Sequence, residues 1–527
     1  MSNTASDAPF DLIVVGAGSA GSALARRAVE RGRRVLLLEA GLDLRSADIP
    51  EVWRSPNPWR ALSNAPSEPQ LIWPGLMATR TDAQQPALYW RGLGVGGSSL
   101  VNGQIAIRPP LEDFDDWAIP GWSRDDVTEP FNRLESDGDF AGEAWHGSDG
   151  PIPIFRTRRE NWGAADKALA DAAMLHGYPW EEDVNRPDAT GVSPYPINSR
   201  AGRRVSSADG YLEDMRDHPG LTIVGSALVD RVLFDGTRSV GVRAIVDGVA
   251  VDHRGEKIAL CAGAVHTPTI LIRSGVGPAD RLDELGIAPV AILPVGEGLQ
   301  DHAMIALNMV MKPEFAMKTP DDRHTNVTIR TTSPVEGAPH NDLMFVSMNQ
   351  SVLAMEYADT TAGHGAFGVW LNSVTSRGQV IVESADPAAQ PLVRENMLST
   401  RDDLDRLTAA VRELIALGRT AERTGMLQEP LETTNAELIA VMSGSQAEID
   451  EYLRASAMDT QHGSGTCRMG DAGDPDRVVD PQLGVVGTTG LYVADASIFP
   501  TVPRANTHLI TVMVGERAAD LLVGPAE

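Results

Sequence analysis

Cysteine is scarce in this sequence, and aromatic residues make up only 5% of it. Two of the 527 residues are cysteine, Cys261 and Cys467, and they lie far apart in the chain. Two distant cysteines exclude a disulfide framework and fit a reducing compartment, so we expect a cytoplasmic protein in which both are small buried hydrophobic residues. The eleven histidines include no His-x-x-x-His pair and there is no cysteine cluster, so we expect no metal centre.

Long apolar runs and excess positive charge are also missing. No stretch is apolar for long enough to span a bilayer, and the first residues lack the basic region of a signal peptide. Lysine and arginine number 45 against 72 acidic residues, which gives a formal net charge of −27. Such a surface would repel nucleic-acid phosphates and anionic membranes. We therefore expect neither nucleic acid nor a membrane as a partner.

The order of strand and helix signals predicts an α/β protein, α+β overall, of two domains. "DLIVVGAGSAGSALARRAVERGRRVLLLEAG" predicts strand, glycine turn, helix and strand, whereas several runs between residues 303 and 383 alternate like an antiparallel sheet. We expect a Rossmann-like dinucleotide-binding domain with an inserted substrate domain, built on an antiparallel sheet backed by helices. The predicted boundaries are 1–155, 200–300 and 456–527 for the first domain, with 42–88 as an extended loop or cap, and 156–199 and 301–455 for the second.

Glycines near the start of the chain indicate a dinucleotide site. Gly16, Gly18 and Gly21 form G-x-G-x-x-G between a strand and a helix, and Glu39 ends the next strand. The first glycine allows a tight turn, the second lets the backbone approach a pyrophosphate, and the third allows close helix packing. The helix N-terminus attracts phosphate. Glu39 can bind ribose hydroxyls and would repel a 2′-phosphate, so NADP is disfavoured. These residues alone leave FAD and NAD open.

Further segments carry a resemblance to a known family. They are "RGLGVGGSSLVNGQIAIRP" (91–109), "GAVHTPTILIRSGVG" (263–277), "GEGLQDH" (296–302) and "VADASIFPTVPRANTHL" (493–509). With the glycine motif they resemble the glucose–methanol–choline (GMC) family of FAD-dependent oxidoreductases over nearly the whole chain. Within it, "HGSDGPIPI", "FGVWLNSVTSRGQ" and "DASIFPTVPRANT" look most like the bacterial 5-hydroxymethylfurfural oxidases and the aryl-alcohol oxidases.

The resemblance implies FAD as the cofactor and places its site in this chain. The implied FAD-binding residues are Gly16, Gly18, Ser19, Ala20, Gly21, Glu39, Ala40, Gly97, Ser98, Asn102, Gly103, Gln104, Val229, Asp495, Ala496 and Thr507. Val101 lies near the place where some relatives have a flavin-linked histidine, so FAD is expected to be non-covalent. Two positions depart from the family pattern: Leu93 replaces arginine or a similar residue, and Gly298 replaces asparagine.

The resemblance also implies the catalytic residues. His462, in "QHGSGTCRMG", matches the family's catalytic histidine, and Asn506 matches its second polar position. An imidazole, with an ordinary pKa of about 6.5, suits a base that takes the hydroxyl proton of an alcohol. Asn506 would hydrogen-bond the substrate oxygen. Taken without the resemblance, His462 could be a core histidine and Asn506 the N-cap of the last helix.

Other candidates surround this pair. Phe367 and Trp370 resemble pocket-wall residues of the furan-alcohol oxidases, and an aromatic wall would suit flat alcohols, although ordinary sheet core is the alternative. We expect Arg504 to make a surface ion pair rather than to bind an acidic substrate, and His508 to lie at the flavin edge or to be structural.

The expected reaction is oxidation of primary aryl or furanic alcohols, with O2 reduced to H2O2. Hydrated aldehydes present the same hydroxyl and hydride, so they are expected as further substrates. One alternative is a dehydrogenase that uses a quinone or another acceptor. Another is a hydroxynitrile lyase that holds FAD as a structural element. Access of oxygen to the flavin would separate the first two, and the sequence does not show it.

Overall fold

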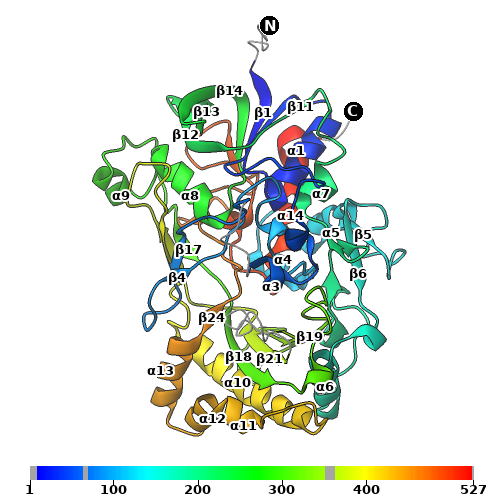
Figure 1. Ribbon diagram of the computed structural model, residues 1–527. Coiled ribbons are helices and arrows are strands. Elements are labelled where there is room, and N and C mark those ends of the chain that lie inside the picture. The colour runs from blue at the N-terminus through cyan, green and yellow to red at the C-terminus, as the bar shows by residue number, and fades with distance from the viewer. Residues whose placement is uncertain (1–8, 63–68, 351–362, 525–527) are drawn as a thin grey trace.

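Two large β-sheets organise the chain, one in the upper half and one in the lower half of Figure 1. The computed structural model describes residues 9–62, 69–350 and 363–524. The blue start and the red end of the chain both belong to the upper half, whereas the yellow and orange helices lie at the bottom (Figure 1). Segments far apart in sequence therefore build each half.

The upper sheet combines parallel and antiparallel pairing. Its strands are β1 (Phe10–Val15), β2 (Val35–Leu38), β11 (Leu221–Val224), β12 (Ala227–Asp235), β13 (Arg238–Val246), β14 (Val249–Leu260) and β25 (Leu491–Val493). Their order is β11-β2-β1-β14-β13-β12, with β25 also paired to β14. β11, β2, β1, β25 and the end of β14 run parallel, and β12, β13 and the start of β14 form a meander. β2 is buried at every residue, as is typical of a parallel strand covered on both faces.

The first and last helices lie side by side against this sheet. They are α1 (Ser19–Glu30), blue in Figure 1, and α14 (Thr507–Val523), red. Gly515 permits their close approach, because a Cβ there would lie 2.3 Å from the carbonyl oxygen of Ala20. Ser19 Oγ lies 2.9 Å from His508 Nδ1, so the two helices begin at the same place. Two helix N-termini, each with a partial positive charge, therefore meet where β1 ends.

The lower sheet is antiparallel and rests on helices. Its strands are β7 (Gly191–Pro194), β18 (Ala303–Val310), β19 (Val327–Thr331), β20 (Leu343–Met348), β21 (His364–Leu371) and β24 (Met458–Asp459), in the order β24-β18-β21-β20-β19-β7. One face packs on α6 (Ala164–Leu175) and α10 (Arg401–Glu422), with α11 (Leu431–Thr434), α12 (Ala436–Val441) and α13 (Gln446–Ser456) beyond them. The predicted fold class, a Rossmann-like domain combined with an antiparallel sheet backed by helices, is confirmed. The domain boundaries stay a prediction.

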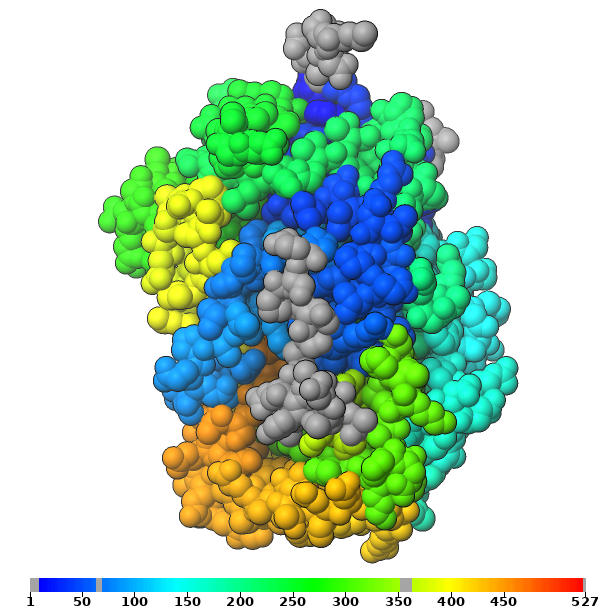
Figure 2. Space-filling view, in the orientation of Figure 1, coloured from blue at the N-terminus to red at the C-terminus, as the bar shows by residue number. Residues whose placement is uncertain are grey.

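Segment 42–88, expected as an extended loop or cap, contains short elements. They are α2 (Glu51–Arg54), α3 (Pro58–Leu62), β3 (Met77–Thr79) and β4 (Ala87–Leu88). β3 and β4 complete a five-stranded sheet with β17 (Glu297–Leu299), β22 (Gly378–Ile381) and β23 (Leu392–Arg394). In Figure 2 the blue residues of this part of the chain cover the middle of the molecule, between the green strands above and the orange helices below. Each element has five residues or fewer, which is too short for a periodic signal.

Other described elements connect these layers. They are α4 (Glu112–Trp117), α5 (Arg124–Leu134), α7 (Ser207–Tyr211), α8 (Gly263–Arg273), α9 (Ala279–Glu284), β5 (Glu135–Asp137), β6 (Ile152–Arg156), β8 (Pro196–Ile197), β9 (Ser199–Arg200), β10 (Arg203–Arg204), β15 (Val276–Gly277) and β16 (Ala291–Ile292). No helix in the described part of the chain combines the length and the hydrophobicity needed to cross a membrane.

Candidate active site

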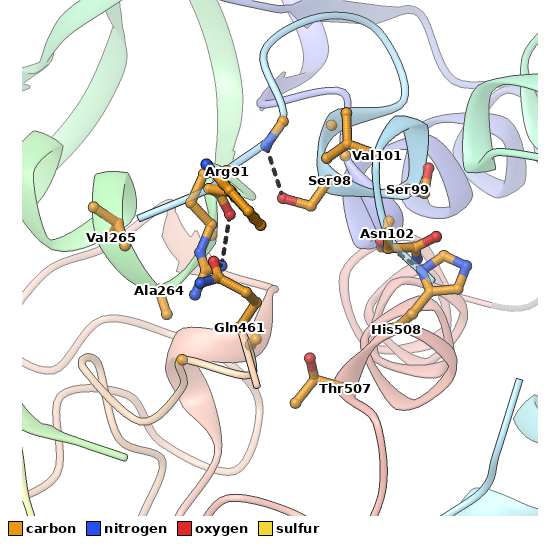
Figure 3. Close-up of a pocket in the computed structure, with 18 of the residues that line it drawn as sticks. Arg91, Ser98, Ser99, Val101, Asn102, Ala264, Val265, Gln461, Thr507 and His508 are labelled. Atoms are coloured by element: carbon orange, nitrogen blue, oxygen red, sulfur yellow. Dashed lines mark hydrogen bonds between the residues drawn. The ribbon is translucent and has the colours of Figure 1, made fainter. Parts of the chain in front are cut away.

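A cavity of about 620 Å³ lies between the two sheets, where the parallel strands of the upper sheet end. Ligands of open α/β sheets bind at this edge. The ends of β1, β2 and β14, the N-termini of α1 and α14, segment 90–103 and one face of the lower sheet line it. Figure 3 shows Arg91 and Gln461 on one side, opposite Val101, Asn102 and His508. Both cysteines are buried, Cys261 beside the cavity.

The glycine turn after β1 has the shape that a bound dinucleotide requires. Gly16 has φ of +100°, and a Cβ there would lie 2.5 Å from Cys261 O. A Cβ on Gly21 would lie 1.9 Å from Gly16 O. In contrast, a Cβ on Gly18 would meet only Gly97 Cα, at 3.9 Å, because Gly18 opens onto the cavity. No described side chain caps α1, so its first N–H groups are available to an anion.

Glu39 joins this turn to the neighbouring loops and also lines the cavity. One carboxylate oxygen accepts hydrogen bonds from the N–H groups of Gly41, at 2.9 Å, and Gly94, at 3.1 Å. The other accepts from Ala17 N at 2.9 Å. Burial raises the pKa of Glu39, and these three donors oppose that shift. Carboxylate oxygens accept about two hydrogen bonds each, so acceptor capacity remains for a ribose hydroxyl.

The segment after Arg91 folds over the turn. Gly97, Ser98, Asn102 and Gly103 line the cavity, as the resemblance implied. Ser98 Oγ accepts a hydrogen bond from Gly92 N at 3.1 Å, drawn as a dashed line in Figure 3. Val101 also lines the cavity, where a histidine could bond a flavin. Nothing in this arrangement supplies a covalent link from that position.

Two predicted residues of this region serve to hold the loop. Gln104 does not line the cavity; it is fully buried, and its Nε2 donates to Ser55 O at 3.0 Å. Asn102 Oδ1 accepts from Gln104 N at 3.0 Å and from a guanidinium nitrogen of Arg204 at 2.7 Å. Leu93, which departs from the family pattern, is held through its backbone, since its N–H donates to Leu71 O at 2.9 Å. The loop is therefore packed without the usual side chain.

The remaining predicted cofactor residues also reach the cavity. The lining includes Ser19, Ala20, Ala40, Val229, Asp495, Ala496 and Thr507. Asp495 caps its own turn through Ser497 N, at 2.8 Å, and accepts from Gly263 N, at 2.8 Å, and Thr267 Oγ1, at 2.6 Å. It thereby fixes the end of β25 to the start of α8. Gly21 faces the packed turn instead.

His462 and Asn506 meet at the opposite end of the cavity. Asn506 Nδ2 lies 3.1 Å from His462 Nε2, and Asn506 Oδ1 accepts a hydrogen bond from Tyr195 OH at 2.8 Å. Asn506 is the N-cap residue of α14, but its side chain makes no capping hydrogen bond there. Burial and the nearby Arg91 lower the pKa of His462 to about 3, so the ring is neutral at physiological pH. A neutral imidazole can accept a proton.

The second ring nitrogen of His462 is also engaged. His462 Nδ1 lies 2.6 Å from Thr460 Oγ1 and 2.9 Å from His302 Nδ1. Thr460 Oγ1 in turn lies 3.2 Å from Asp301 Oδ1. Asp301 and His302 belong to the "LQDH" segment, whose similarity to the family had been noted without a role. Gly298, in the same segment, has φ of +81°, a conformation that glycine and asparagine adopt more readily than other residues.

The lower sheet separates the two predicted wall residues. Trp370 lines the cavity, 6.5 Å from the ring of His462, together with Met304, Val346 and Met348. Phe367 lies in the core between β21 and the helices and does not reach the cavity. Side chains three residues apart on a strand point to opposite faces, so both could not face the substrate. For Phe367 the structure supports the alternative of ordinary sheet core.

Arg504 and His508 also have defined places. Arg504 is buried in an ion pair with Asp113 and donates to Asp116 Oδ2 at 2.9 Å, away from the cavity. The ion pair is as expected, but it is buried rather than exposed. His508 lines the cavity, and burial lowers its pKa to about 4.

Among the residues that the structure describes, one buried group could geometrically hold a metal ion: Glu135, Asp137 and His146. Cations already contact it, because Arg108 lies 2.6 Å from Glu135 and Arg156 lies 3.0 Å from Asp137. The group lies outside the cavity.

Several site residues escaped the sequence analysis. Tyr195, Thr460, Asp301 and His302 bond the catalytic pair directly or through one another. Asp301 and His302 share the "GEGLQDH" segment, whereas Tyr195 and Thr460 come from other parts of the chain. Arg91 is the first residue of the segment 91–109, and the resemblance implied no role for it. Its guanidinium donates to Gln461 Oε1 at 2.7 Å and lies 3.8 Å from the centre of the Tyr89 ring.

Comparison with known proteins gives this geometry a family. The GMC oxidoreductase N-terminal model matches residues 10–304, and the C-terminal GMC oxidoreductase model matches residues 374–515. The chain is 33% identical to 5-(hydroxymethyl)furfural oxidase of Methylovorus sp. (strain MP688), over 99% of this chain and 100% of that protein. It is 34% identical to an oxygen-dependent choline dehydrogenase of Ectopseudomonas mendocina (strain ymp), over 97% of this chain and 93% of that protein.

A solved structure agrees. Pyridoxine 4-oxidase from Mesorbium loti superposes with a TM-score of 0.84 at 26% identity, over 97% of this chain and 98% of that one. The prediction of an FAD-binding oxidoreductase acting on CH–OH groups is confirmed at the level of the family. The matched regions include both the glycine turn and the His462–Asn506 pair, and the chain belongs to the GMC oxidoreductase family.

Proposed function

We propose that the protein is an FAD-dependent oxidase of primary aryl or furanic alcohols that reduces O2 to H2O2. The observation that carries the proposal is the contact of 3.1 Å between His462 Nε2 and Asn506 Nδ2, in the same cavity as the glycine turn. The similarity to a 5-(hydroxymethyl)furfural oxidase supports the substrate class. Hydrated aldehydes offer the same hydroxyl group and are included.

FAD would be held non-covalently along the upper sheet. Gly18 and the free N–H groups of α1 suit the pyrophosphate, and Glu39 suits the adenosine ribose. Asn102, Thr507 and the N-terminus of α14 would surround the flavin end. Bound there, FAD supplies the hydride acceptor of the reaction.

The polar pair would handle the hydroxyl proton. His462 is neutral, since burial and Arg91 lower its pKa to about 3. Its Nε2 is the ring nitrogen that lies next to Asn506, and both residues line the cavity. The hydrogen bond from Tyr195 to Asn506 Oδ1 turns the Asn506 NH2 toward His462. A substrate hydroxyl within hydrogen-bond distance of both atoms, on the cavity side of the pair, would give its proton to Nε2 and receive a hydrogen bond from Nδ2.

The charges of the cavity favour a neutral alcohol over a cationic one. Among the lining carboxylates in the described ranges, Glu39 and Asp495 belong to the dinucleotide end. Asp459 accepts from Arg80 Nε at 2.5 Å, so its charge is neutralised. Arg91 adds a positive charge near His462. The wall formed by Trp370 and its neighbours is apolar and suits a flat ring.

The test combines anaerobic flavin reduction with oxygen consumption. Purified holoenzyme is mixed without oxygen with benzyl alcohol, 5-hydroxymethylfurfural or choline, and the loss of flavin absorbance is followed. Bleaching by the two neutral alcohols, together with O2 uptake and H2O2 formation, supports the proposal. Turnover with an artificial acceptor alone would show the dehydrogenase instead. A faster reaction with choline would refute the substrate class, and no bleaching by any alcohol would favour the lyase.

A further inference from the structure

The His462 ring also makes defined polar contacts on the side that faces away from Asn506. His462 Nδ1 lies 2.6 Å from Thr460 Oγ1, and Thr460 Oγ1 lies 3.2 Å from Asp301 Oδ1. Asp301 and His462 are both buried. Buried polar groups are hydrogen-bonded, so a donor and an acceptor can be assigned to each hydrogen bond from His462 through Thr460 to Asp301.

Asp301 sets the direction at its end. Its carboxylate receives the N–H of His302 at 2.8 Å and the hydroxyl of Tyr89 at 3.2 Å. Burial raises the pKa of Asp301, and Arg91 together with the surrounding hydrogen-bond donors acts against that shift. Thr460 Oγ1 contacts Asp301 Oδ1, the same oxygen that accepts the N–H of His302, and the Thr460 hydroxyl is the donor in that contact. Thr460 Oγ1 is then left as an acceptor for an N–H at His462 Nδ1.

The other end of the ring leads independently to the same assignment. Tyr195 OH donates to Asn506 Oδ1 at 2.8 Å, so the NH2 group of Asn506 faces His462. Asn506 Nδ2, a donor, lies 3.1 Å from His462 Nε2. Nε2 must therefore carry a lone pair, and the proton of the neutral ring lies on Nδ1.

We infer that Thr460 and Asp301 are positioning residues that hold His462 in the tautomer with its proton on Nδ1 and its lone pair on Nε2. The inference rests on the proposed function, in which His462 is the base. In that step the alcohol O–H bond breaks, the proton bonds to Nε2, and the electron pair stays on the substrate oxygen. The Nδ1–H bond remains intact, and Asp301, through Thr460, offsets the charge of the imidazolium.

His302 explains why the hydroxyl of Thr460 is needed. Its Nδ1 lies 2.9 Å from His462 Nδ1, and a proton on either ring would satisfy that contact. With the proton on His302, His462 would carry its own proton on Nε2 and could not act as a base. Thr460 removes this ambiguity, since it accepts from His462 and donates to Asp301. Burial and the adjacent His462 hold the pKa of His302 well below its usual range, so His302 adds no charge.

Other charged groups on neighbouring elements lie near the hydrogen bonds that join His462, Thr460 and Asp301. Arg91 lies 4.0 Å from Asp301. Asp459 on β24 is paired with Arg80. Glu395, after β23, is 1% exposed, and burial together with Asp459 and Asp301 raises its pKa well above the usual range. Arg91 and Arg80 thus lie beside Asp301 and Asp459, and proton transfer adds the positive charge of the imidazolium together with the negative charge left on the substrate oxygen.

The kinetic test uses three threonine variants. Thr460→Val removes the hydroxyl and Thr460→Ser keeps it. Thr81→Val removes a different buried hydroxyl, which donates to Arg454 O at 2.7 Å outside the cavity. In Thr460→Val the anaerobic rate of flavin reduction by alcohol should fall about 10- to 100-fold, the usual effect of losing the partner that orients a functional imidazole. KM should change little, and the solvent deuterium isotope effect on that rate should rise. Thr460→Ser and Thr81→Val should stay close to the parent protein.

Two results would overturn the inference. One is a Thr460→Val protein that reduces as fast as Thr460→Ser across the pH range. The other is a Thr460→Ser protein as slow as Thr460→Val, because the hydroxyl would then not be what matters. FAD content and absorbance spectra of all variants show whether each is a properly loaded holoenzyme.

A second measurement does not depend on turnover. ¹⁵N NMR of histidine-labelled holoenzyme, with the His462 signals identified by their loss in His462→Gln, reports which nitrogen carries the proton. A protonated Nδ1 in the parent protein that is partly lost in Thr460→Val supports the inference, and a protonated Nε2 in the parent refutes it. If the NMR result holds while no alcohol bleaches the flavin, the proposed function fails and the tautomer assignment stands.

Discussion

Replacing the second and the third glycine of the first turn, one at a time, should separate cofactor binding from folding. Gly18 has φ of −78° and ψ of −157°, which alanine can adopt, and a Cβ there would meet only Gly97 Cα at 3.9 Å. Gly18→Ala should therefore leave the apoprotein as stable as before, or more stable by about 0.4–1 kcal/mol through its effect on the unfolded chain. The new methyl group would occupy the space of the pyrophosphate.

Gly21→Ala should behave in the opposite way. Its Cβ would lie 1.9 Å from Gly16 O, a backbone atom that cannot move without opening the turn. Overpacking of this kind costs about 1–3 kcal/mol. The melting temperature of the apoprotein should therefore fall in Gly21→Ala and not in Gly18→Ala.

The expected effect of Gly18→Ala on FAD affinity follows from the hydrogen bonds that the new methyl group would displace. Loss of one charge-assisted hydrogen bond from the α1 N-terminus costs about 1.5–3 kcal/mol. That corresponds to a rise in Kd of roughly 10- to 150-fold. Fluorescence titration of apoprotein with FAD measures Kd, and thermal denaturation of the same samples measures stability. Unchanged FAD affinity in Gly18→Ala would show that the pyrophosphate does not lie against this turn.

Four further outcomes are expected. Because the pKa of His462 is lowered to about 3 by burial and Arg91, and the neutral ring is the active form, kcat/KM should stay flat from pH 8 to about pH 5 and decline only at lower pH; an acid limb near pH 6.5 would contradict this. His462→Ala should lower kcat by about 10²- to 10⁴-fold with FAD still bound, as absorbance and steady-state rates would show. Burial lowers the pKa of His146, but hydrogen bonds to Asp183 and Glu135 raise it to about 9. A raised pKa stabilises the fold fully below the unfolded value of about 6.5, and this contribution is lost as pH rises toward 9. The melting temperature should therefore fall more steeply between about pH 6.5 and pH 9 in the parent protein than in His146→Gln. Arg504→Leu leaves Asp113 buried without its cation and should destabilise the protein by about 3–5 kcal/mol in denaturant unfolding, with KM unchanged; a raised KM alone would indicate a substrate contact.

The two halves of the active site differ in how far the sequence predicted them. The glycine turn is local: its glycines, the strand before and the helix after lie within 21 residues, from Phe10 to Glu30, so spacing alone identified it. His462 and Asn506 carry no local signature, and their assignment came from similarity to the family. The alternation of side chains along a strand predicts the different places of Phe367 and Trp370. The two residues are an odd number of positions apart on β21, so their side chains must face opposite sides of the sheet.

By itself, the sequence determined the fold class and the cofactor turn, because periodicity and glycine spacing act between residues that are close along the chain, and it determined the family through the resemblance of several longer segments. Only the tertiary structure decided which polar groups surround His462. Tyr195, Asp301, Thr460 and Asn506 come from four separate segments, and their bond directions depend on contacts between 2.6 and 3.2 Å that form when the two sheets close on the cavity. Hydrogen bonds are that short-ranged, so the protonation state of the base is a property of the folded chain.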